Sequence, residues 1–589
     1  MNSPVLLTII ASLFLTSAKA AKTEFRVDPI VVKAKSSFDS LNDEAFIPQK
    51  KVSFDANRNG TQDVLDKTLA FPSTNYGYPS GAMGTRLGGL SIEDTQVSTL
   101  GVPLNLPQGG GPDLSLFPAF LWSGASISSV PQLGGYSPQG VSGSIQFDLW
   151  TRTAIRDYKP STDLNRITGS YDRNLQNFSV ATKKQTSAIL VGMNFGRMKG
   201  SAASISLYAI RNPRNHLLFH MLGSDQDGDD PGSKNYPTPN ARKKFWRVIP
   251  VLESHQEFGD TEKPLIWEST ISADFQQLAT NNPDDPIYDA SAKTQQYGIE
   301  NALHYENSTL ALTVRQLNFQ KSAVTVHDLP VMAQYSYDFQ LTSNLKMKLA
   351  GGGNYMNDTG FAPSGRALLK QSITDEDSLF FELNSLNRMP TMVDRYYVDS
   401  SYRGNPNLKP ARINTLIAGM ENKKDDFENT TTIKLEQRNQ IIVYASGTPL
   451  STMINQGNAW LVSANEDFTF KPFKPITQRI GTVLSFSQLT DSGRSYPDLP
   501  TISVVHNGKY ELNDSLALRN NLRYMGISKN YLGLDHSDYF LADLSIDWSI
   551  KKEITATLGC DNLFDKRAEI VEGYPLPGRI AYLNLQMNL

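Results

Sequence analysis

Residues 540–550 read FLADLSIDWSI, and apolar and polar side chains alternate along this stretch. Phe540, Leu544 and Trp548 belong to the apolar face, whereas Asp543 and Asp547 belong to the polar face. The same alternation recurs in three further segments, 345–349, 554–560 and 581–589. Period two over nine or more residues predicts β-strands that are long enough to cross a bilayer, with one face toward lipid.

A soluble β-sandwich would also alternate, but its strands are usually shorter, about five or six residues. Short polar turns occur near Asn307, Asn344, Pro475, Asp514 and Lys552; the spacing is 37 residues from 307 to 344, 39 from 475 to 514 and 38 from 514 to 552. This spacing fits two strands and one long loop, the asymmetric hairpin of an outer-membrane barrel. Residues 155–589 would then form an antiparallel transmembrane barrel of about 22 strands, the number typical of plugged transporters, and 20 or 24 strands fit nearly as well.

The amino terminus indicates export. Residues 5–18 are mostly apolar but too short to span a bilayer, and Ala18-Lys19-Ala20 has the pattern of a signal-peptidase site. We therefore expect residues 1–20 to be a signal peptide, the alternative being a buried N-terminal helix. Residues 36–154 contain more Gly and Pro and shorter alternations, so we expect a globular α+β plug inside the lumen.

Composition excludes several other classes of protein. A net charge of −3 argues against a protein that coats nucleic acid. The single cysteine, Cys560, excludes an intramolecular disulfide framework, and seven scattered histidines leave little room for a multi-histidine catalytic centre.

The motifs in order along the chain resemble those of TonB-dependent outer-membrane receptors, of the compact cobalamin or siderophore type. The segment 27–34 (VDPIVVKA) resembles their TonB box. Five other stretches resemble plug and barrel signatures of the family: 85–90, 93–105, 136–145, 387–410 and 561–579. Two departures stand out: residues 124–130 lack the usual acidic plug strand, which puts its plug-to-barrel ion pairing in doubt, and the chain ends in Leu589 rather than an aromatic residue.

The resemblance implies a mechanical link to the inner membrane through residues 21–35. Ile30, Val31 and Val32 are β-branched and could add as a strand to the sheet of a partner, while Asp28 and Pro29 precede them and Pro29 disfavours a helix. We expect these five residues to bind TonB and its inner-membrane energising complex. An ordinary first strand of the plug is the alternative.

Substrate recognition is expected where the plug apices meet the long barrel loops. The candidates are turn-rich plug segments and an aromatic and cationic barrel segment: Tyr76, Tyr78, Gln108, Gly110, Arg395, Tyr396, Tyr397 and Tyr402. Aromatic rings and guanidinium groups could hold a bulky, partly anionic ligand. Plain loop chemistry and an interfacial aromatic girdle are the competing interpretations.

No cofactor is expected to be required, although calcium in an outer loop is one possibility. Residues 225–230 contain four carboxylates, of Asp225, Asp227, Asp229 and Asp230, around a glycine, which resembles the start of a calcium loop. The distal glutamate of such loops is missing, so a solvated acidic loop is the favoured interpretation. Bound calcium would favour a cobalamin-type receptor, and the absence of histidine from 387–410 disfavours haem as substrate.

These observations predict an outer-membrane receptor of a Gram-negative bacterium that imports a scarce, large nutrient. An iron–siderophore, cobalamin or another metal chelate would bind at the outer face, and energy-coupled movement of the plug would release it. We expect a monomer embedded in outer-membrane lipid, with no nucleic-acid partner and no enzymatic activity. A passive porin is the alternative; a barrel enzyme would need a catalytic constellation that the sequence does not offer.

Overall fold

The structure is a computed structural model, and the chain divides into two units, residues 1–36 and 37–589. Described residues all lie in the second unit: 46, 49–54, 60–75, 83–129, 141–151, 165–171, 175–184, 187–196, 199–211, 214–230, 232–234, 236–259, 262–284, 290–321, 324–398, 402–445, 451–473, 475–530, 533–552 and 554–588. The predicted signal peptide and the TonB-box segment therefore lie outside the described residues.

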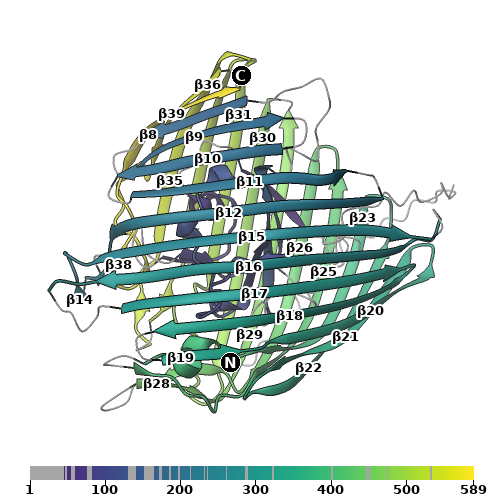
Figure 1. Ribbon diagram of the computed structural model, residues 1–589. Helices are drawn as coiled ribbons and strands as arrows, with labels where there is room; N and C mark the ends of the chain where they lie inside the picture. Colours follow the sequence, from purple (N-terminus) through teal and green to yellow (C-terminus); the bar gives the residue numbers. More distant parts are fainter. Residues whose placement is uncertain are drawn as a thin grey trace, which may run out of the picture. The chain divides into compact units, whose positions relative to one another are not determined.

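A closed antiparallel β-barrel forms the larger part of the molecule (Figure 1). Its strands are β8 (Asn165–Tyr171), β9 (Leu175–Lys184), β10 (Ser187–Gly196), β11 (Lys199–Arg211), β12 (Asn215–Asp229), β15 (Arg242–Phe258), β16 (Leu265–Asn281), β17 (Ala290–Tyr305), β18 (Ser308–Lys321), β19 (Val324–Asp328), β20 (Val331–Thr342), β21 (Leu345–Met356), β22 (Gly360–Ser372), β23 (Asp377–Arg388), β25 (Ala411–Lys424), β26 (Phe427–Asn439), β29 (Asn458–Phe473), β30 (Ile476–Leu489), β31 (Ile502–Asn513), β32 (Leu516–Met525), β35 (Tyr539–Lys551), β36 (Ile554–Asp561) and β39 (Ile580–Asn588).

Pairing of β39 with β8 closes this sheet. β19 and β20 pair with successive parts of β18 and share one place, so the 23 labelled strands of the described chain fill 22 places around the barrel. The predicted barrel and its strand number are confirmed.

The two ends of the barrel differ in the length of their connections. Tight turns join strands at all five places where the sequence predicts them, for example between β17 and β18 and between β31 and β32. We call this the turn end. The opposite end, the loop end, carries long connections such as 389–410, 440–457 and 490–501. In outer-membrane barrels short turns face the periplasm and long loops face the outside.

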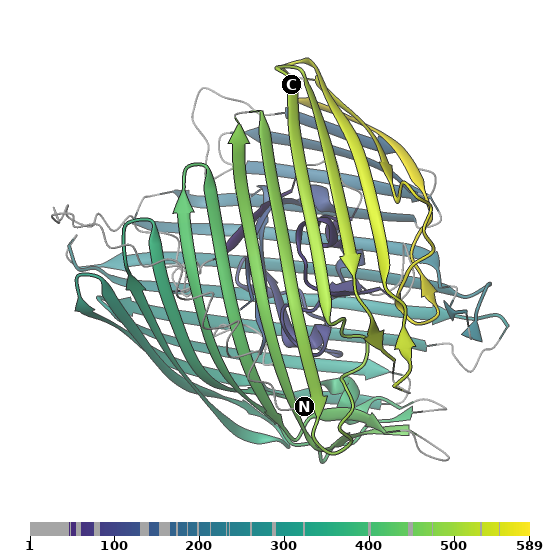
Figure 2. The same cartoon turned by 180° about the vertical axis from the view of Figure 1, so that it is seen from behind.

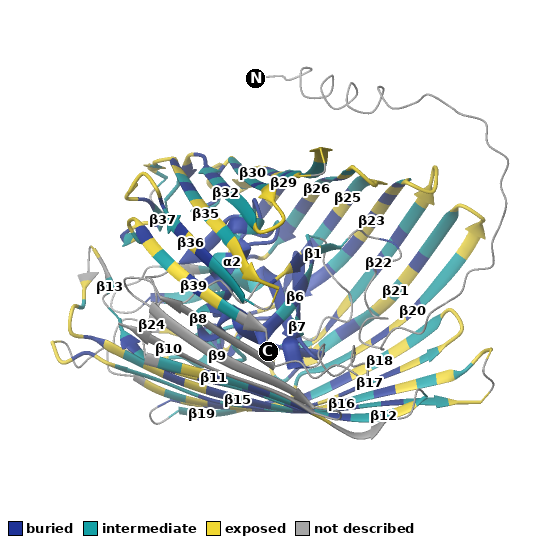
Figure 3. Cartoon of the chain, turned by 90° about the horizontal axis from the view of Figure 1, so that it is seen from above, coloured by how far each residue is buried: buried dark blue, intermediate teal, exposed yellow. Residues whose placement is uncertain are grey.

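The outward faces of the strands are apolar, as the alternation predicts. Leu544, Trp548 and Leu558 are exposed on the outside of the barrel, whereas Asp543 and Asp547 of the same hairpin face the lumen and are partly covered. Figure 3 shows the resulting alternation of buried and exposed residues along the coloured strands, for example β15 to β18. No helix in the described part of the chain is long and apolar enough to cross a membrane.

A small α+β domain, the plug, fills the lumen (Figure 2, purple segments). Its elements are β1 (Lys50–Ser53), α2 (Thr61–Thr68), β2 (Ser73–Asn75), β3 (Met83–Thr85), η2 (Ile92–Asp94), β4 (Thr95–Thr99), β5 (Val102–Pro103), η3 (Leu114–Leu116), η4 (Ala119–Leu121), β6 (Trp122–Ser128) and β7 (Gly143–Leu149). Five strands form a mixed sheet in the order β1-β6-β7-β4-β5, in which β4 and β7 are parallel.

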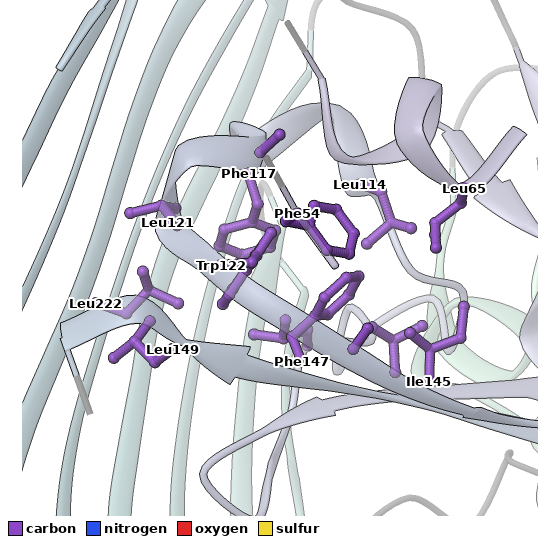
Figure 4. Close-up of a cluster of buried hydrophobic side chains, with 14 of the residues drawn as sticks. Phe54, Leu65, Leu114, Phe117, Leu121, Trp122, Ile145, Phe147, Leu149 and Leu222 are labelled. Carbon is purple, nitrogen blue, oxygen red and sulfur yellow. The ribbon is translucent and has the colours of Figure 1, made fainter. Parts of the chain in front are cut away.

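Aromatic side chains build the core of the plug (Figure 4). Trp122 stacks on Phe147 at 4.7 Å between ring centroids, and Phe54 meets Phe147 edge-on at 5.6 Å. The Trp122 indole also donates to the Thr61 hydroxyl (2.8 Å), which ties α2 to the sheet. Leu222 of the barrel wall belongs to the same buried cluster, so the plug core continues into the barrel.

Smaller elements lie in the long connections at the loop end. They are β13 (Gly232–Ser233), β14 (Tyr236–Pro237), α4 (Met392–Tyr396), β24 (Tyr402–Arg403), β27 (Ile442–Ala445), β28 (Ser451–Asn455), β33 (Ser528–Lys529), β34 (Asp535–His536), β37 (Glu569–Val571) and β38 (Tyr574–Pro575). The β24-β28-β27 sheet links two of the connections that border the lumen.

Candidate functional site

A cavity of about 450 Å³ lies between the plug and the long connections of the barrel. Plug residues around η2 form one side, and connections 389–410, 440–457, 490–501 and 526–538 form the other. We call it the loop-end cavity. Its position matches the expectation that plug apices and barrel loops meet over the lumen.

Charged and apolar side chains line different parts of the loop-end cavity. The charged groups are Arg86, Glu93, Arg388, Asp394, Asp491 and Arg494. The apolar wall is formed by Leu90, Ile441, Ile442, Val443, Met453, Leu489 and Tyr496. Such a wall with a few converging charges can hold a small molecule that has an apolar body and ionised groups.

Beneath this cavity, a buried ion pair fastens the plug to the barrel. Arg438 of β26 donates to Asp94 of η2 at 2.7 Å, and Asp94 is completely buried. The same carboxylate oxygen accepts the backbone N–H groups of Leu90 and Ser91, both at 3.0 Å. We call the Asp94–Arg438 pair the lock.

The barrel side of the lock is a row of charges on β26. Glu436 accepts from both Arg438 and Lys434, and the Lys434 ammonium also donates to the Gly88 carbonyl of the plug. Arg438 further donates to the Ser142 hydroxyl at 3.0 Å. One strand of the wall therefore contacts three separate plug segments.

The electrostatics of the lock favour an ionised Asp94. Burial alone raises the pKa of this carboxyl group, but the charges of Arg438 and Arg388 and the bond from Ser91 outweigh it and hold the pKa below its usual range. Asp94 is therefore anionic at neutral pH, and the lock is a full ion pair.

Arg86 of the plug motif 85–90 donates to a hydroxyl of the plug and joins the plug to the barrel through two backbone carbonyls. Its Nε donates to the Thr74 hydroxyl (3.1 Å) and its Nη1 to the backbone carbonyls of Asp498 (3.0 Å) and Pro497 (3.4 Å). Burial raises the pKa of the Asp498 carboxyl group, and the Arg86 charge offsets this only in part. Arg86 thus holds the 490–501 connection against the plug.

Two further sets of contacts join the plug to the wall. Arg247 of β15 donates to Asp274 (2.7 Å) and to the Leu104 carbonyl of the plug (2.7 Å). On the other side, Lys67 of α2 forms an ion pair with Asp561 (2.7 Å) beside a cavity of about 140 Å³. The plug is therefore fixed to the barrel on several sides by buried polar contacts.

A second large cavity, of about 440 Å³, lies at the turn end beside β1. Lys50 of β1 forms an ion pair with Asp467 of β29, whose carboxylate also accepts from Arg479 of β30 (2.7 Å). β1 lies at the edge of the plug sheet, and among the described strands its partner is β6. The first described strand of the plug is thus held to the wall by one shared carboxylate.

The predicted plug residues Gln108 and Gly110 lie in the turn after β5. The Gln108 carbonyl accepts the backbone N–H of Val393 (2.8 Å), and its side chain lies within 3.3 Å of the Thr294 hydroxyl. The Gly110 carbonyl accepts from the Asn105 amide (2.7 Å). Both residues shape the turn beside Gly109, which lines the loop-end cavity. Tyr76 and Tyr78 lie outside the described residues, so their assignment remains a prediction.

The predicted barrel residues around 395 form a network of their own. Arg395 is only 1 % exposed and pairs with Asp328 (2.9 Å) and Asp358 (3.1 Å), so its guanidinium is already engaged. The Tyr396 hydroxyl donates to Asp358 at 2.6 Å; burial and this bond raise the pKa of Tyr396 to about 12. The Tyr397 ring lies 3.1 Å from the Lys321 ammonium, and the side chain of Tyr402 is not described.

Three of the four carboxylates at 225–230 lie in a strand and not in a loop as expected. Asp225, Asp227 and Asp229 belong to β12, where Arg242 pairs with both Asp227 (2.7 Å) and Asp229 (3.4 Å). The Asp230 backbone N–H bonds to the Ala241 carbonyl at the end of that strand. Within the described ranges no group of three His, Cys, Asp or Glu side chains is arranged to hold a metal ion. Calcium binding therefore remains a prediction without structural support.

Sequence reasoning missed Asp94, Arg388 and Arg438, the residues that join the loop-end cavity to the lock. Asp94 stands in a quoted plug motif and Arg388 in a quoted barrel motif, so the motifs did contain them. No local pattern connects Asp94 with Arg438, because the pair is separated by 344 residues.

Comparisons with known proteins agree with this fold. Residues 382–575 match the family model described as "Outer membrane protein beta-barrel family", and no curated protein matches the sequence. The siderophore receptor PirA from Acinetobacter baumannii is 13 % identical, with a TM-score of 0.75 over 93 % of this chain and 99 % of that one.

Two further structures are similar to the same extent. A mutant of the ferric enterobactin receptor PfeA from Pseudomonas aeruginosa has a TM-score of 0.74 at 13 % identity, covering 93 % of this chain and 99 % of its own. The copper transporter OprC has a TM-score of 0.76 at 12 % identity, covering 92 % and 100 %. Residues 382–575 thus match an outer-membrane β-barrel family. The described chain shares the fold of these three structures, so its resemblance to TonB-dependent receptors is confirmed at the level of the fold.

Proposed function

We propose that the chain is a TonB-dependent outer-membrane receptor that imports a scarce, large nutrient, such as an iron–siderophore, another metal chelate or cobalamin. The observation that carries the proposal is a closed barrel whose lumen is filled by its own N-terminal domain, with a cavity of about 450 Å³ on the loop side of that domain. The plug lies between this cavity and the turn end of the barrel. A ligand bound in the cavity can therefore be released at the turn end only if the plug moves.

The contacts between plug and barrel support energy-coupled rather than passive transport. A passive porin would need a lumen free of the Asp94–Arg438, Arg247–Leu104 and Lys67–Asp561 contacts. The outer membrane has no ion gradient of its own, so the force must come from the inner membrane through TonB. Residues Asp28 to Val32 are the proposed attachment point, and they precede β1, the edge strand of the plug sheet.

Growth and uptake test this function. A strain that lacks the protein should grow poorly when iron or cobalamin is scarce, and the full chain should restore growth and cellular content of that nutrient. The chain lacking residues 27–34, or carrying Val31→Pro, should fail, because proline prevents strand pairing with a partner. Val31→Ile keeps the β-branched side chain and serves as the matched control. Uptake that survives the deletion unchanged would contradict energy coupling.

A further inference from the structure

Arg388 is a cation of the loop-end cavity with a buried donor that is unpaired in the described part of the chain. It is the last residue of β23, and its side chain lines the cavity. Its Nε is buried and has no hydrogen-bond partner among the described residues. Two other arginines of this region are engaged: Arg438 by Asp94, and Arg86 by the carbonyls of the 490–501 connection. A third, Arg494, is exposed to solvent, so water can satisfy its donors. A buried donor without a partner destabilises the protein, so a ligand that supplied an acceptor here would remove that cost.

The groups around Arg388 leave room for an anion. Asp394, Asp94 and Glu93 attract its charge most strongly, and within the described ranges no ion pair joins Arg388 to these carboxylates. Asp94 is held by Arg438, and Asp394 accepts the Thr391 N–H as the cap of α4 (2.9 Å). These carboxylates stabilise the guanidinium without occupying its donors.

We propose that Arg388 binds an anionic oxygen pair of the substrate, of the carboxylate class, and that the substrate's apolar part lies against the wall formed by Met453 and Tyr496. This inference rests on the proposed function and narrows its substrate class to anionic chelates. A guanidinium presents parallel N–H donors that match a carboxylate edge, which an ammonium group cannot do.

The same residue connects ligand binding to the lock. The Arg388 charge is one of the two that stabilise the ionised Asp94 carboxylate. An anion bound at Arg388 offsets that charge, so the attraction between Asp94 of the plug and Arg388 of β23 becomes weaker. A ligand in the cavity thereby weakens the attachment of the plug to the barrel although it does not contact the lock.

Citrate and its neutral trimethyl ester are a suitable pair of probes, because they share a skeleton and differ in charge. The full chain in detergent is titrated with each by isothermal calorimetry. Citrate should bind at millimolar concentration and the ester should not. Arg388→Gln should weaken citrate binding at least tenfold, and Arg388→Lys should weaken it less. Arg412→Gln is the matched control, since Arg412 lies on the neighbouring strand at the same height and is exposed on the outward face.

Hydrogen exchange tests the connection to the lock. Citrate should accelerate exchange of the Leu90 and Ser91 amides, which donate to Asp94, in the wild type but not in Arg388→Gln. Equal citrate affinity of the wild type and both Arg388 variants, or no citrate binding by the wild type, would overturn the assignment. Unchanged exchange with citrate bound would overturn the connection to the lock.

These measurements need no TonB, so they separate the two proposals. Uptake that depends on residues 27–34 together with unaltered citrate binding in Arg388→Gln would refute this inference alone. Loss of citrate binding in that variant with uptake independent of residues 27–34 would refute the proposed function and leave the anion site in place.

Discussion

Replacing Asp94 with asparagine should loosen the plug while leaving the barrel intact. The substitution keeps the size of the side chain and lets its oxygen still accept from Leu90 and Ser91. It removes the charge that pairs with Arg438 at 2.7 Å. Arg438 is itself only 4 % exposed, so water cannot replace the lost partner.

The size of the effect follows from the burial of both groups. Removing one partner of a buried ion pair costs about 3–5 kcal/mol. Arg438 keeps Glu436, which is shared with Lys434, so we expect the lower end of this range, about 3 kcal/mol. A difference of this size raises the population of undocked plug about 100-fold.

Planar bilayer recordings and hydrogen exchange measure that population. Asp94→Asn should open conducting events far more often than the wild type, and the amides of η2 and β4 should exchange faster. Glu93→Gln is the matched control, because Glu93 precedes Asp94 in η2 and makes no ion pair in the described structure. If both variants conduct and exchange like the wild type, the lock does not hold the plug.

Three other predictions follow from the structure. The pKa of Asp94 is lowered in the folded protein, so the stabilisation by the lock is complete above the ordinary carboxyl pKa of about 4 and is lost as the pH falls through the lower folded pKa. Wild-type conductance should therefore stay constant from neutral pH down to that lower pKa and rise below it, whereas Asp94→Asn should show no such transition. Arg247→Leu leaves Asp274 buried without its cation, at a cost of about 3–5 kcal/mol, and should lower the thermal unfolding temperature. Arg242→Leu, at an exposed ion pair, should leave that temperature unchanged, and equal unfolding temperatures of the two variants would refute the buried pairing. Leu558→Arg, at a lipid-facing position in the middle of β36 that is 62 % exposed, should lower the free energy of unfolding by about 2–4 kcal/mol in a refolding assay with lipid vesicles. Leu512→Arg, next to a turn and 60 % exposed, should lower it by under about 1 kcal/mol, and equal losses would contradict the membrane placement.

The barrel could be predicted from sequence because its signal is local. Alternation along a strand, as in 540–550, fixes which face meets lipid, and a two-residue turn fixes where the next strand begins. Both features are visible within about 40 residues of sequence, and the structure reproduces them.

The candidate site was harder to predict because its contacts are not local. Arg395 is of a residue type that often binds ligands, yet its guanidinium forms ion pairs with Asp328 and Asp358, which are far away in sequence. The acidic stretch at 225–229 predicts a loop because its charges interrupt the apolar alternation, whereas β12 continues through it.

The histidine residues also form contacts that local sequence patterns do not predict. The histidines are scattered along the chain, but strand pairing brings His216, His255 and His304 together on one wall of the lumen. His255 and His304 bond to the two oxygens of Glu268 (2.8 and 3.0 Å), and the His216 and His255 rings stack at 4.9 Å. Register between strands decides such contacts, and spacing along the sequence does not reveal it.

A disulfide between plug and barrel tests most directly whether the lumen is filled as described. A Cβ added at Gly481 of β30 would lie 3.4 Å from the Cβ of Ala70 in the plug, close to the separation in a disulfide. In a Cys560→Ser background, Ala70→Cys with Gly481→Cys should crosslink in intact cells and block uptake until it is reduced. Ala70→Cys with Ile480→Cys, on the exposed outward face, should not crosslink. Failure of the first pair to crosslink, or equal crosslinking of both pairs, would contradict a plug seated inside this barrel.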